Sequence, residues 1–327
     1  MESSVIKIGV MGCASIAARS LIPAIRGNSS FQLVAVASRD SKKAEALAAK
    51  VGCRAITGYE HLLSADIDAV YMPLPTGLHE EWVGRCLEAG KHVFVEKSFG
   101  ISYAATRRMA EEAKKKGLVI MEDFMFLYHR QHAFLLKMIR EGTIGRIRNF
   151  RASFGFPPLP HGNFRYDKAL GGGALLDAGA YTVKAAQAVL GPELSVEAAA
   201  LFKCPKNGVD ISGSAFMIYG QETSVHLTWG FDNFYQCGYE IWGTKGKITT
   251  SRSFTAAPGY QPSIRLELPG EIREFLLPAD NHFNNILDAF AGYLKSGDYL
   301  APAREIEEQS RLVDQVATRS VTYAIRH

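Results

Sequence analysis

The chain has 327 residues, which is long for one hydrophobic core and suits two domains. Hydrophobic residues make up 47% and charged residues 21%, an ordinary composition for a soluble globular protein and far from that of disordered chains. The net charge is +4 and the basic residues are scattered, so nothing in the sequence indicates a nucleic-acid-binding surface.

The cysteines and the N-terminus indicate the compartment. Five cysteines are present, an odd number, widely spaced and without a C-x-x-C pair. This pattern argues for reduced thiols in a cytoplasmic protein and against a disulfide framework or a zinc site. Met1 leads directly into an expected strand without a signal peptide, and no apolar run is long enough to span a bilayer. We therefore expect a cytoplasmic protein with no membrane partner and no metal.

The first half of the chain alternates apolar, β-branched segments with helical patterns. Such alternation predicts a doubly wound parallel sheet, whose first strand is buried on both faces. The expected strands are 5–11, 31–37, 54–56, 68–72, a segment ending near 95, and 118–121, and the expected helices run to about 26 and over 41–51, 58–64, 79–89 and 102–116.

A glycine follows the first strand directly. The segment Gly12-Cys13-Ala14-Ser15-Ile16-Ala17 has the strand, turn and helix context of a dinucleotide-binding fingerprint, with alanine at the second and third glycine positions. Its turn leaves backbone amides at a helix N-terminus, where a pyrophosphate would bind. The alternative is an ordinary turn between a strand and a helix.

The end of the second strand distinguishes the two nicotinamide cofactors. A site for NAD usually carries an acidic residue here, whereas an arginine accommodates the 2′-phosphate of NADP. The strand ends in Ser38-Arg39, and Asp40 lies beyond the arginine, where it can cap the helix that begins near Ser41. The sequence therefore favours NADP(H) over NAD(H).

Two more strands end in polar residues at the carboxyl edge, where ligands bind in open α/β sheets. One runs into Pro73-Leu74-Pro75 and then His79, which opens the next helix. The other ends in Glu96-Lys97, and a lysine at this place can tune a neighbouring proton donor. The alternatives are a solvated helix-start residue for His79 and a surface ion pair for Glu96 and Lys97.

The second half changes character, because short strands follow one another between turns. This pattern predicts an antiparallel or mixed sheet in a second domain. We expect a helix over 131–140, a strand over 146–154, a buried helix over 174–189, strands over 195–204, 211–219, 222–230, 236–242, 246–251, 262–268 and 271–277, and final helices over 280–296 and 303–323. The expected domains are 1–122 and 123–327.

A glycine run precedes two polar residues on an otherwise apolar helix. Gly171-Gly172-Gly173 lets the backbone pass close to another group, because glycine has no Cβ. Asp177 and Tyr181 follow at i and i+4, so both side chains emerge on one face of the helix. The alternative is an acidic residue placed near the positive end of the helix dipole, with a tyrosine in the core.

These residues, in this order, resemble the glucose-fructose oxidoreductase, inositol dehydrogenase and rhizopine-catabolism (Gfo/Idh/MocA) oxidoreductase family. The resemblance covers most of the chain. It includes Gly12-x-Ala14-x-x-Ala17, Pro75-x-x-x-His79, Gly90-Lys91-His92-Val93 leading to Glu96-Lys97, Glu122, Phe124, His129, Gln131-His132, Gly142, Gly145, the segment from Gly171 to Tyr181, and Gly243-Thr244-x-Gly246.

The resemblance implies a Rossmann domain followed by an α+β domain built on a large, open, mainly antiparallel sheet. In this family the nicotinamide lies in the cleft between the domains, and oligomers form through the open sheets, so a homodimer or homotetramer is expected. Residues expected to contact the cofactor are Gly12, Ala14, Ser15, Ile16, Ser38, Arg39, Leu74, His79, Glu96, Lys97 and Arg165.

Three residues match the family's active-site positions. Lys97 and Asp177 match its lysine and aspartate, and Tyr181 stands at a third position that is often histidine. A tyrosine there resembles the branch of nucleotide-sugar 3-ketoreductases, dihydrodiol dehydrogenases and NADP-linked xylose dehydrogenases. Arg165 matches an arginine near the nicotinamide. Four positions depart from the family pattern. Ser98 and Arg130 stand where the family usually has proline, Leu127 where it has arginine, and Phe164 where it has tryptophan.

The expected chemistry is hydride transfer between the nicotinamide and a sugar carbon. Tyr181 would donate or accept the proton, and the Lys97 ammonium would favour the phenolate and lower the phenol's pKa. Asp177 would orient the substrate hydroxyl or hold Lys97. We favour reduction of a nucleotide-linked 3-ketosugar. The alternatives are an NADP-dependent dehydrogenase of a free aldose or cyclic diol, and a non-catalytic NADP-binding regulator.

Overall fold

A computed structural model describes residues 5–325, and the expectation that Met1 leads directly into a strand lies outside this range. The chain forms two compact units. One consists of Met1–Asp123 with Phe283–Glu307, and the other of Phe124–His282 with Glu308–His327. The boundary after Asp123 lies one residue from the expected one. The expected domain 123–327 did not foresee that the segment Phe283–Glu307 belongs to the first unit.

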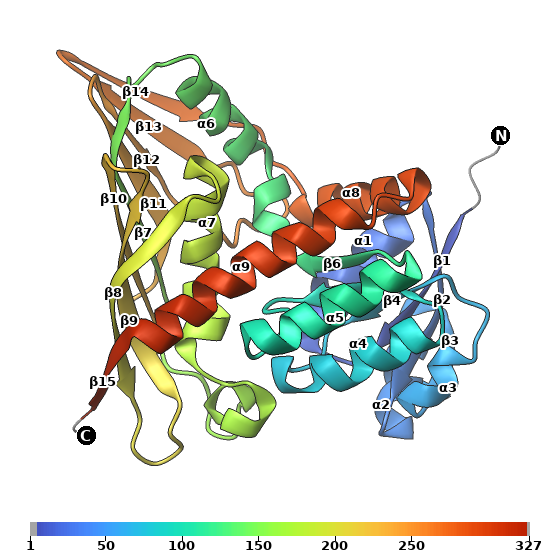
Figure 1. Cartoon of the computed structure of the whole chain (residues 1–327). Helices are drawn as coiled ribbons and strands as arrows, with labels where there is room; N and C mark the ends of the chain where they lie inside the picture. The colour runs from blue at the N-terminus through green and yellow to red at the C-terminus, as the bar shows by residue number, and fades with distance from the viewer. Residues whose placement is uncertain (1–4, 326–327) are drawn as a thin grey trace. The chain divides into compact units, whose positions relative to one another are not determined.

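The first unit contains a six-stranded parallel sheet, as the sequence predicted (Figure 1). Its strand order is β3-β2-β1-β4-β5-β6, the order of a doubly wound sheet. The strands are β1 Ile6–Met11, β2 Phe31–Ser38, β3 Arg54–Thr57, β4 Ala69–Met72, β5 His92–Glu96 and β6 Ile120–Asp123. The helices are α1 Ile22–Gly27, α2 Ser41–Val51, α3 Tyr59–Leu63, α4 His79–Glu88, α5 Tyr103–Lys116, α8 His282–Ser296 and the start of α9 Leu300–Arg319.

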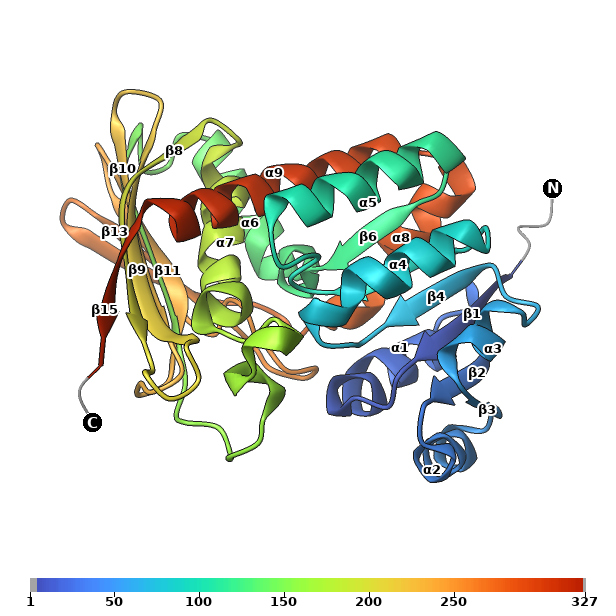
Figure 2. The same ribbon diagram turned by 60° about the horizontal axis from the view of Figure 1, so that its bottom comes forward.

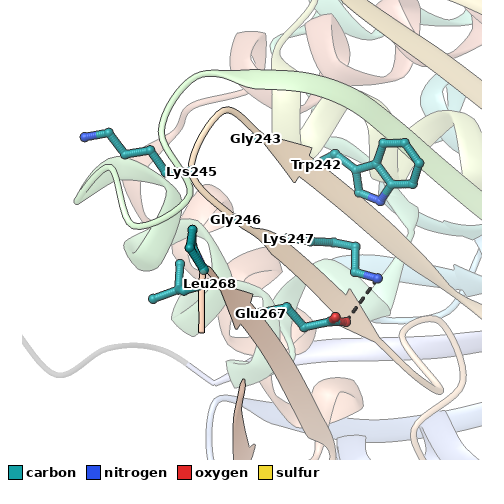
Figure 3. A pocket seen from close by; sticks show the side chains of 8 residues that line it. Trp242, Gly243, Lys245, Gly246, Lys247, Glu267 and Leu268 are labelled. Carbon is teal, nitrogen blue, oxygen red and sulfur yellow. Dashed lines mark ion pairs between the residues drawn. The ribbon is translucent and has the colours of Figure 1, made fainter. Parts of the chain in front are cut away.

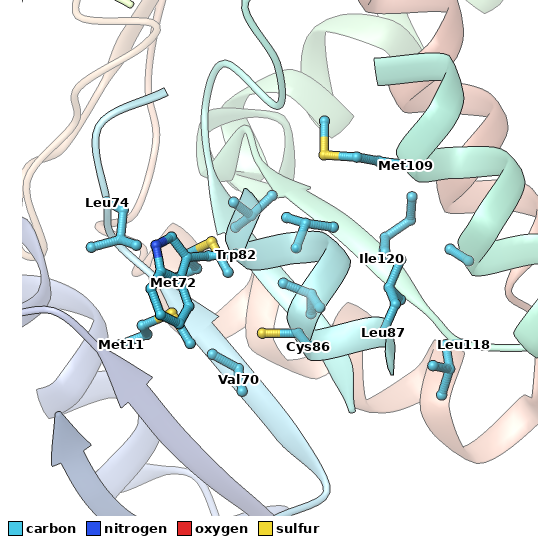
Figure 4. Packing of buried hydrophobic residues seen from close by; sticks show 14 of the residues in the cluster. Met11, Val70, Met72, Leu74, Trp82, Cys86, Leu87, Met109, Leu118 and Ile120 are labelled. Atoms are coloured by element: carbon cyan, nitrogen blue, oxygen red, sulfur yellow. The ribbon is translucent and has the colours of Figure 1, made fainter. Parts of the chain in front are cut away.

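Side chains on both faces of this sheet are buried, which explains the continuous apolar runs of its strands. On one face, Val70 and Met72 pack with Trp82 of α4 and Met109 of α5 (Figure 4). On the other face, Phe94 stacks on Phe290 of α8, with 5.3 Å between ring centroids. Helix α8 therefore completes the core of the first unit, although it comes from the last fifth of the chain.

The second unit contains a nine-stranded mixed sheet in the order β14-β13-β12-β11-β7-β10-β9-β8-β15. The pairs β7–β10 and β8–β15 are parallel and the other pairs are antiparallel, so the expected large, mainly antiparallel sheet is confirmed. The strands are β7 Ile147–Gly155, β8 Leu194–Lys203, β9 Asp210–Tyr219, β10 Thr223–Gly230, β11 Gln236–Gly243, β12 Lys247–Thr250, β13 Ser263–Leu268, β14 Glu271–Leu276 and β15 Ser320–Ala324.

Helices α6 Arg130–Arg140 and α7 Ala180–Leu190 lie on one side of this sheet (Figures 1 and 2). Phe150 and Phe154 of β7 are buried on that side, whereas Arg151 between them is exposed on the other. The sheet thus has one covered face and one face that no helix of the described second unit covers.

Three helices differ from their predicted form. The first begins with a π-helical segment, Ala17–Leu21, before α1. The expected helix 174–189 begins with a π-helical segment, Leu175–Gly179, before α7. The expected helix 303–323 ends at Arg319, and Ser320–Ala324 forms the edge strand β15 instead. The β-branched residues Val321 and Thr322 suit a strand that pairs with β8. No helix within residues 5–325 is both long enough and apolar enough to cross a bilayer.

Candidate active site

The turn after β1 has the features of a dinucleotide-binding loop. Gly12 has φ +122°, a conformation that favours glycine, and its amide donates to the Ala37 carbonyl of β2 at 2.8 Å. Within the described chain the amides of Cys13, Ala14 and Ser15 donate to no protein acceptor, and these residues are at least partly exposed. Free amides where a helix begins are suited to a pyrophosphate. The loop therefore fits the cofactor that the sequence predicts.

The loop between β2 and α2 carries the predicted specificity residues. Asp40 accepts hydrogen bonds from the amides of Lys42 at 3.0 Å and Lys43 at 3.3 Å, so it caps α2 as the sequence suggested. Ser38 is buried, and its hydroxyl accepts from the Asp40 amide at 3.2 Å. Arg39 is exposed. Because the carboxylate faces the helix, the loop presents a cation rather than an acid.

Lys97 follows directly after β5, at the carboxyl edge of the sheet. The residue before it, Glu96, accepts a hydrogen bond from the Tyr71 hydroxyl at 2.8 Å. Two residues after Lys97, the Phe99 amide donates to the buried Glu122 carboxylate at 2.8 Å. Residues of neighbouring strands therefore fix the chain on both sides of Lys97.

His79 also fixes this loop. Its imidazole is fully buried, and burial lowers its pKa, so the alternative of a solvated helix-start residue is wrong. Nδ1 lies 3.0 Å from the Ser98 carbonyl and 3.1 Å from the Phe99 carbonyl, and Nε2 lies 2.8 Å from the Leu74 carbonyl. His79 thereby joins the loop after β4 to the loop after β5, in which the Lys97–Ser98 peptide bond is cis. Direct contact of His79 with a cofactor stays a prediction.

In the second unit, the glycine run allows two loops to approach. The Gly172 amide donates to the Asp167 carbonyl at 2.9 Å, and the Gly173 amide donates to the Arg165 carbonyl at 3.0 Å. A Cβ on Gly172 would lie 2.5 Å from the Arg165 carbonyl oxygen, too close for any other residue. The run therefore holds the Arg165 loop against the start of the helix that carries Asp177.

The sequence did not single out Asp210, which anchors the same helix. Its carboxylate accepts a hydrogen bond from the Leu175 amide at 2.7 Å, and a Cβ on Gly173 would collide with it. Burial raises the pKa of Asp210. Asp210 lies at the start of β9, 35 residues away in sequence, so no local signal links it to the helix.

Asp177 and Arg165 form an ion pair. The Arg165 Nε donates to the Asp177 Oδ2 at 2.6 Å, and both side chains are mostly buried, with 28% and 14% exposed. The guanidinium also lies over the Phe164 ring, 4.7 Å from its centroid. The structure thus brings together two predicted site residues whose contact the sequence did not foresee.

Tyr181 lies in a box of aromatic rings. Its ring is 6% exposed and packs against those of Phe124, Phe126, Phe154 and Phe254, with centroids 5.2 to 5.8 Å away. The hydroxyl donates to the sulfur of Met125 at 3.8 Å, and a thioether is a weak acceptor. The box therefore fixes the ring firmly, while the Met125 contact binds the hydroxyl only weakly.

The predicted residues thus form two groups. Gly12, Ser38, Arg39, His79, Glu96 and Lys97 lie at the carboxyl edge of the first sheet, and Arg165, Asp177 and Tyr181 lie around the start of α7. Because Lys97 and Tyr181 belong to different units, their interaction stays a prediction. No cluster of three or more His, Cys, Asp or Glu side chains suited to a metal occurs in the described range.

A pocket of about 420 Å³ lies in the second unit, beside strands β11 to β13 (Figure 3). Trp242, Lys247 and Glu267 line it, and the last two form an ion pair of 3.0 Å. Close packing explains the neighbouring Gly243-Thr244-x-Gly246 motif, since a Cβ on Gly246 would lie 2.6 Å from the Glu267 carbonyl oxygen. None of the predicted site residues lines this pocket.

Most of the chain matches one oxidoreductase family. Residues 6–124 match the model described as "Oxidoreductase family, NAD-binding Rossmann fold", and residues 132–249 match that of the "GFO/IDH/MocA C-terminal domain". The chain therefore belongs to the Gfo/Idh/MocA oxidoreductases, and the resemblance drawn from its motifs is confirmed.

Particular members are similar over nearly their full length. The chain is 43% identical to the dTDP-3,4-didehydro-2,6-dideoxy-alpha-D-glucose 3-reductase of Saccharopolyspora spinosa, over 89% of this chain and 88% of the relative. It is 30% identical to D-xylose 1-dehydrogenase (NADP(+)) 2 of Haloferax volcanii, over 89% of each chain. Among solved structures, KijD10, a 3-ketoreductase from Actinomadura kijaniata in complex with NADP and TDP-benzene, matches with a TM-score of 0.96 and 38% identity, over 99% of this chain and 100% of that one.

Proposed function

We propose that this protein is an NADPH-dependent reductase that acts on the 3-keto group of a dTDP-linked sugar. Tyr181 carries the proposal, because it presents a phenol from a rigid aromatic box, one helical turn after the Asp177–Arg165 ion pair. The similarity to dTDP-sugar 3-reductases, which exceeds that to the xylose dehydrogenase, supports the substrate class.

The first unit would hold the cofactor. The amides of Cys13, Ala14 and Ser15 would bind the pyrophosphate, and Arg39 would bind the 2′-phosphate, since Asp40 is engaged as a helix cap. When bound, NADPH supplies the hydride. The loop of Lys97, tied by His79 and Glu122, would stay fixed during the reaction.

The protein's own part in the chemistry is proton transfer. Reduction of a ketone places negative charge on its oxygen, and Tyr181 would donate a proton to that oxygen. The Lys97 ammonium would stabilise the phenolate that remains. Asp177 would orient the sugar through its carboxylate, whose direction is set by Arg165. The aromatic rings around Tyr181 would keep water away from the phenol.

The open face of the nine-stranded sheet would join copies of the chain into a homodimer or homotetramer. Trp242 on this face is 38% exposed, with the Arg151 guanidinium stacked 4.3 Å from its ring centroid. The edge strands β14 and β15 expose Leu276 by 67% and Val321 by 57%. Apolar groups exposed on an uncovered sheet face and along its edge strands favour association. The five free thiols support a reducing compartment such as the cytoplasm.

Two substrate panels test the function. One offers NADPH with dTDP-linked ketosugars, and the other offers NADP⁺ with free aldoses, inositols and cyclic diols, each repeated with NADH or NAD⁺. We expect turnover with the first panel and a preference for NADPH. Turnover with the second panel alone would instead make the protein a catabolic dehydrogenase. Tight NADPH binding without turnover in either panel would point to a regulator.

A further inference from the structure

The loop that follows β12 contains an unusual backbone conformation. Arg252 has φ +48°, and it is the one non-glycine residue with a positive φ in the described range. Such a conformation costs an arginine about 1 kcal/mol or more relative to its ordinary conformations. The side chain is exposed, so packing in the core does not explain why an arginine stands here.

The guanidinium of Arg252 lies between two tyrosines. It is 5.2 Å from the ring centroid of Tyr235 and 5.7 Å from that of Tyr260. These contacts within the described chain are with aromatic rings rather than with a carboxylate. In contrast, Arg165 pairs with Asp177, and Arg265 pairs with both Glu267 and Glu274. The charge of Arg252 is therefore held in place without being neutralised.

The loop that carries this cation also contributes to the Tyr181 box in the second unit. Phe254, two residues after Arg252, is a wall of that box, with its ring centroid 5.8 Å from that of Tyr181. Tyr235 is fixed by a 2.7 Å hydrogen bond between its hydroxyl and that of Thr255. The residue before it, Phe234, is 86% exposed. The loop of Arg252 thus supplies one wall of the box around the proposed proton donor, and Phe234 precedes a tyrosine that is bonded to the same loop.

The geometry points to a subsite for the nucleoside diphosphate part of the substrate, formed by Arg252, Tyr235, Tyr260 and Phe234. This inference rests on the proposed function and names the residues that would recognise the nucleotide. A diphosphate is an anion that a guanidinium binds through paired hydrogen bonds. A base stacks on an aromatic face, as the exposed ring of Phe234 allows. The two tyrosines hold the guanidinium ready, so little side-chain entropy is lost on binding.

The test is calorimetric titration of thymidine 5′-diphosphate into protein saturated with NADP⁺. Arg252→Gly is the main variant, because glycine adopts a positive φ without strain and the chain should fold at least as well. We expect the affinity for the diphosphate to fall by roughly 10- to 100-fold, the effect of losing hydrogen bonds to a charged group. Arg265→Ala, an exposed arginine on β13, is the matched control and should bind like the wild type.

Steady-state kinetics separate this inference from the proposed function. With a dTDP-linked ketosugar, Arg252→Gly should raise KM by a similar factor while kcat and the KM for NADPH change little. Suppose that the wild type binds the diphosphate but does not reduce ketosugars, and that Arg252→Gly loses the binding. This result would support the subsite and reject the reductase function. If the wild type reduces ketosugars and Arg252→Gly keeps the same diphosphate affinity and the same KM, the subsite would be overturned. Failure of the wild type to bind the diphosphate would overturn it as well.

Discussion

Replacing Tyr181 with phenylalanine should separate the chemistry of the site from its folding. The variant keeps the ring and its four aromatic neighbours and removes the hydroxyl, whose hydrogen bond to the Met125 sulfur is 3.8 Å long. Loss of a hydroxyl with its hydrogen bonding typically changes the free energy of unfolding by about 0.5–1.5 kcal/mol, so the variant should stay folded. Loss of a proton donor should slow reduction by about 10²- to 10⁴-fold, a rise in the barrier of about 3–5 kcal/mol.

The assay follows the absorbance of NADPH with a dTDP-linked ketosugar, together with the affinity for NADPH and urea unfolding of the same preparations. We expect kcat to collapse in Tyr181→Phe, while NADPH affinity and the unfolding midpoint stay close to those of the wild type. Full turnover by the variant would refute the assignment of Tyr181 as proton donor.

Tyr239→Phe provides a matched control in the same aromatic cluster. Its hydroxyl lies 2.7 Å from Nδ1 of the buried His132, so the substitution leaves that nitrogen without its partner. The expected cost is about 1–3 kcal/mol of stability, with kcat retained. If Tyr181→Phe lost as much stability as Tyr239→Phe, its lower activity would reflect the fold rather than the chemistry.

Three further predictions follow from the two units. Arg39→Ala should raise KM for NADPH by about 10- to 100-fold and leave that for NADH almost unchanged, because only NADPH carries the 2′-phosphate. Asp210→Ala should lower the free energy of unfolding by about 1–2 kcal/mol in urea and lower kcat, since the Leu175 amide loses its acceptor, whereas Asp210→Asn should lose less. Burial lowers the pKa of His132 from 6.5 to about 4 and that of His282 to about 3, so both stay neutral in the folded chain and bind protons on unfolding below about pH 6.5. Between about pH 6.5 and 4, urea titrations should therefore show the free energy of unfolding falling by up to about 1.4 kcal/mol per pH unit for each histidine, and a flat profile would contradict this.

The fold could be predicted wherever the pattern of buried residues is local. Strands alternating with helices indicated the parallel sheet, and seven expected strands after position 194 match β8 to β14 within two residues. The C-terminal strand Ser320–Ala324 was missed because the helical pattern before it is strong, and its strand character depends on pairing with β8. Likewise, the pattern of α8 shows an apolar face without showing which sheet that face covers.

The sequence could propose the candidate site as a set of residues but not as a set of contacts. Lys97, Asp177 and Tyr181 stand within recognisable motifs, whereas the partners that hold them are distant in sequence. Arg165 meets Asp177 across 12 positions, and His79 reaches the Lys97 loop across 19 and 20. Such contacts depend on how loops at the ends of different strands approach one another, which periodicity within one segment does not encode.

The place of Phe290 has a consequence for synthesis of the protein. Phe290 stacks on Phe94 and lies 6.3 Å from Phe31, so the core of the first unit needs a helix made long after its sheet. Ribosomes add about 5–20 residues each second, and the 184 residues from 124 to 307 therefore take roughly 10 to 40 s. During that interval the nascent parallel sheet exposes one apolar face, and the unit that is begun first is completed only after most of the second unit has been made. A chaperone that binds apolar surfaces would meet this protein at that stage.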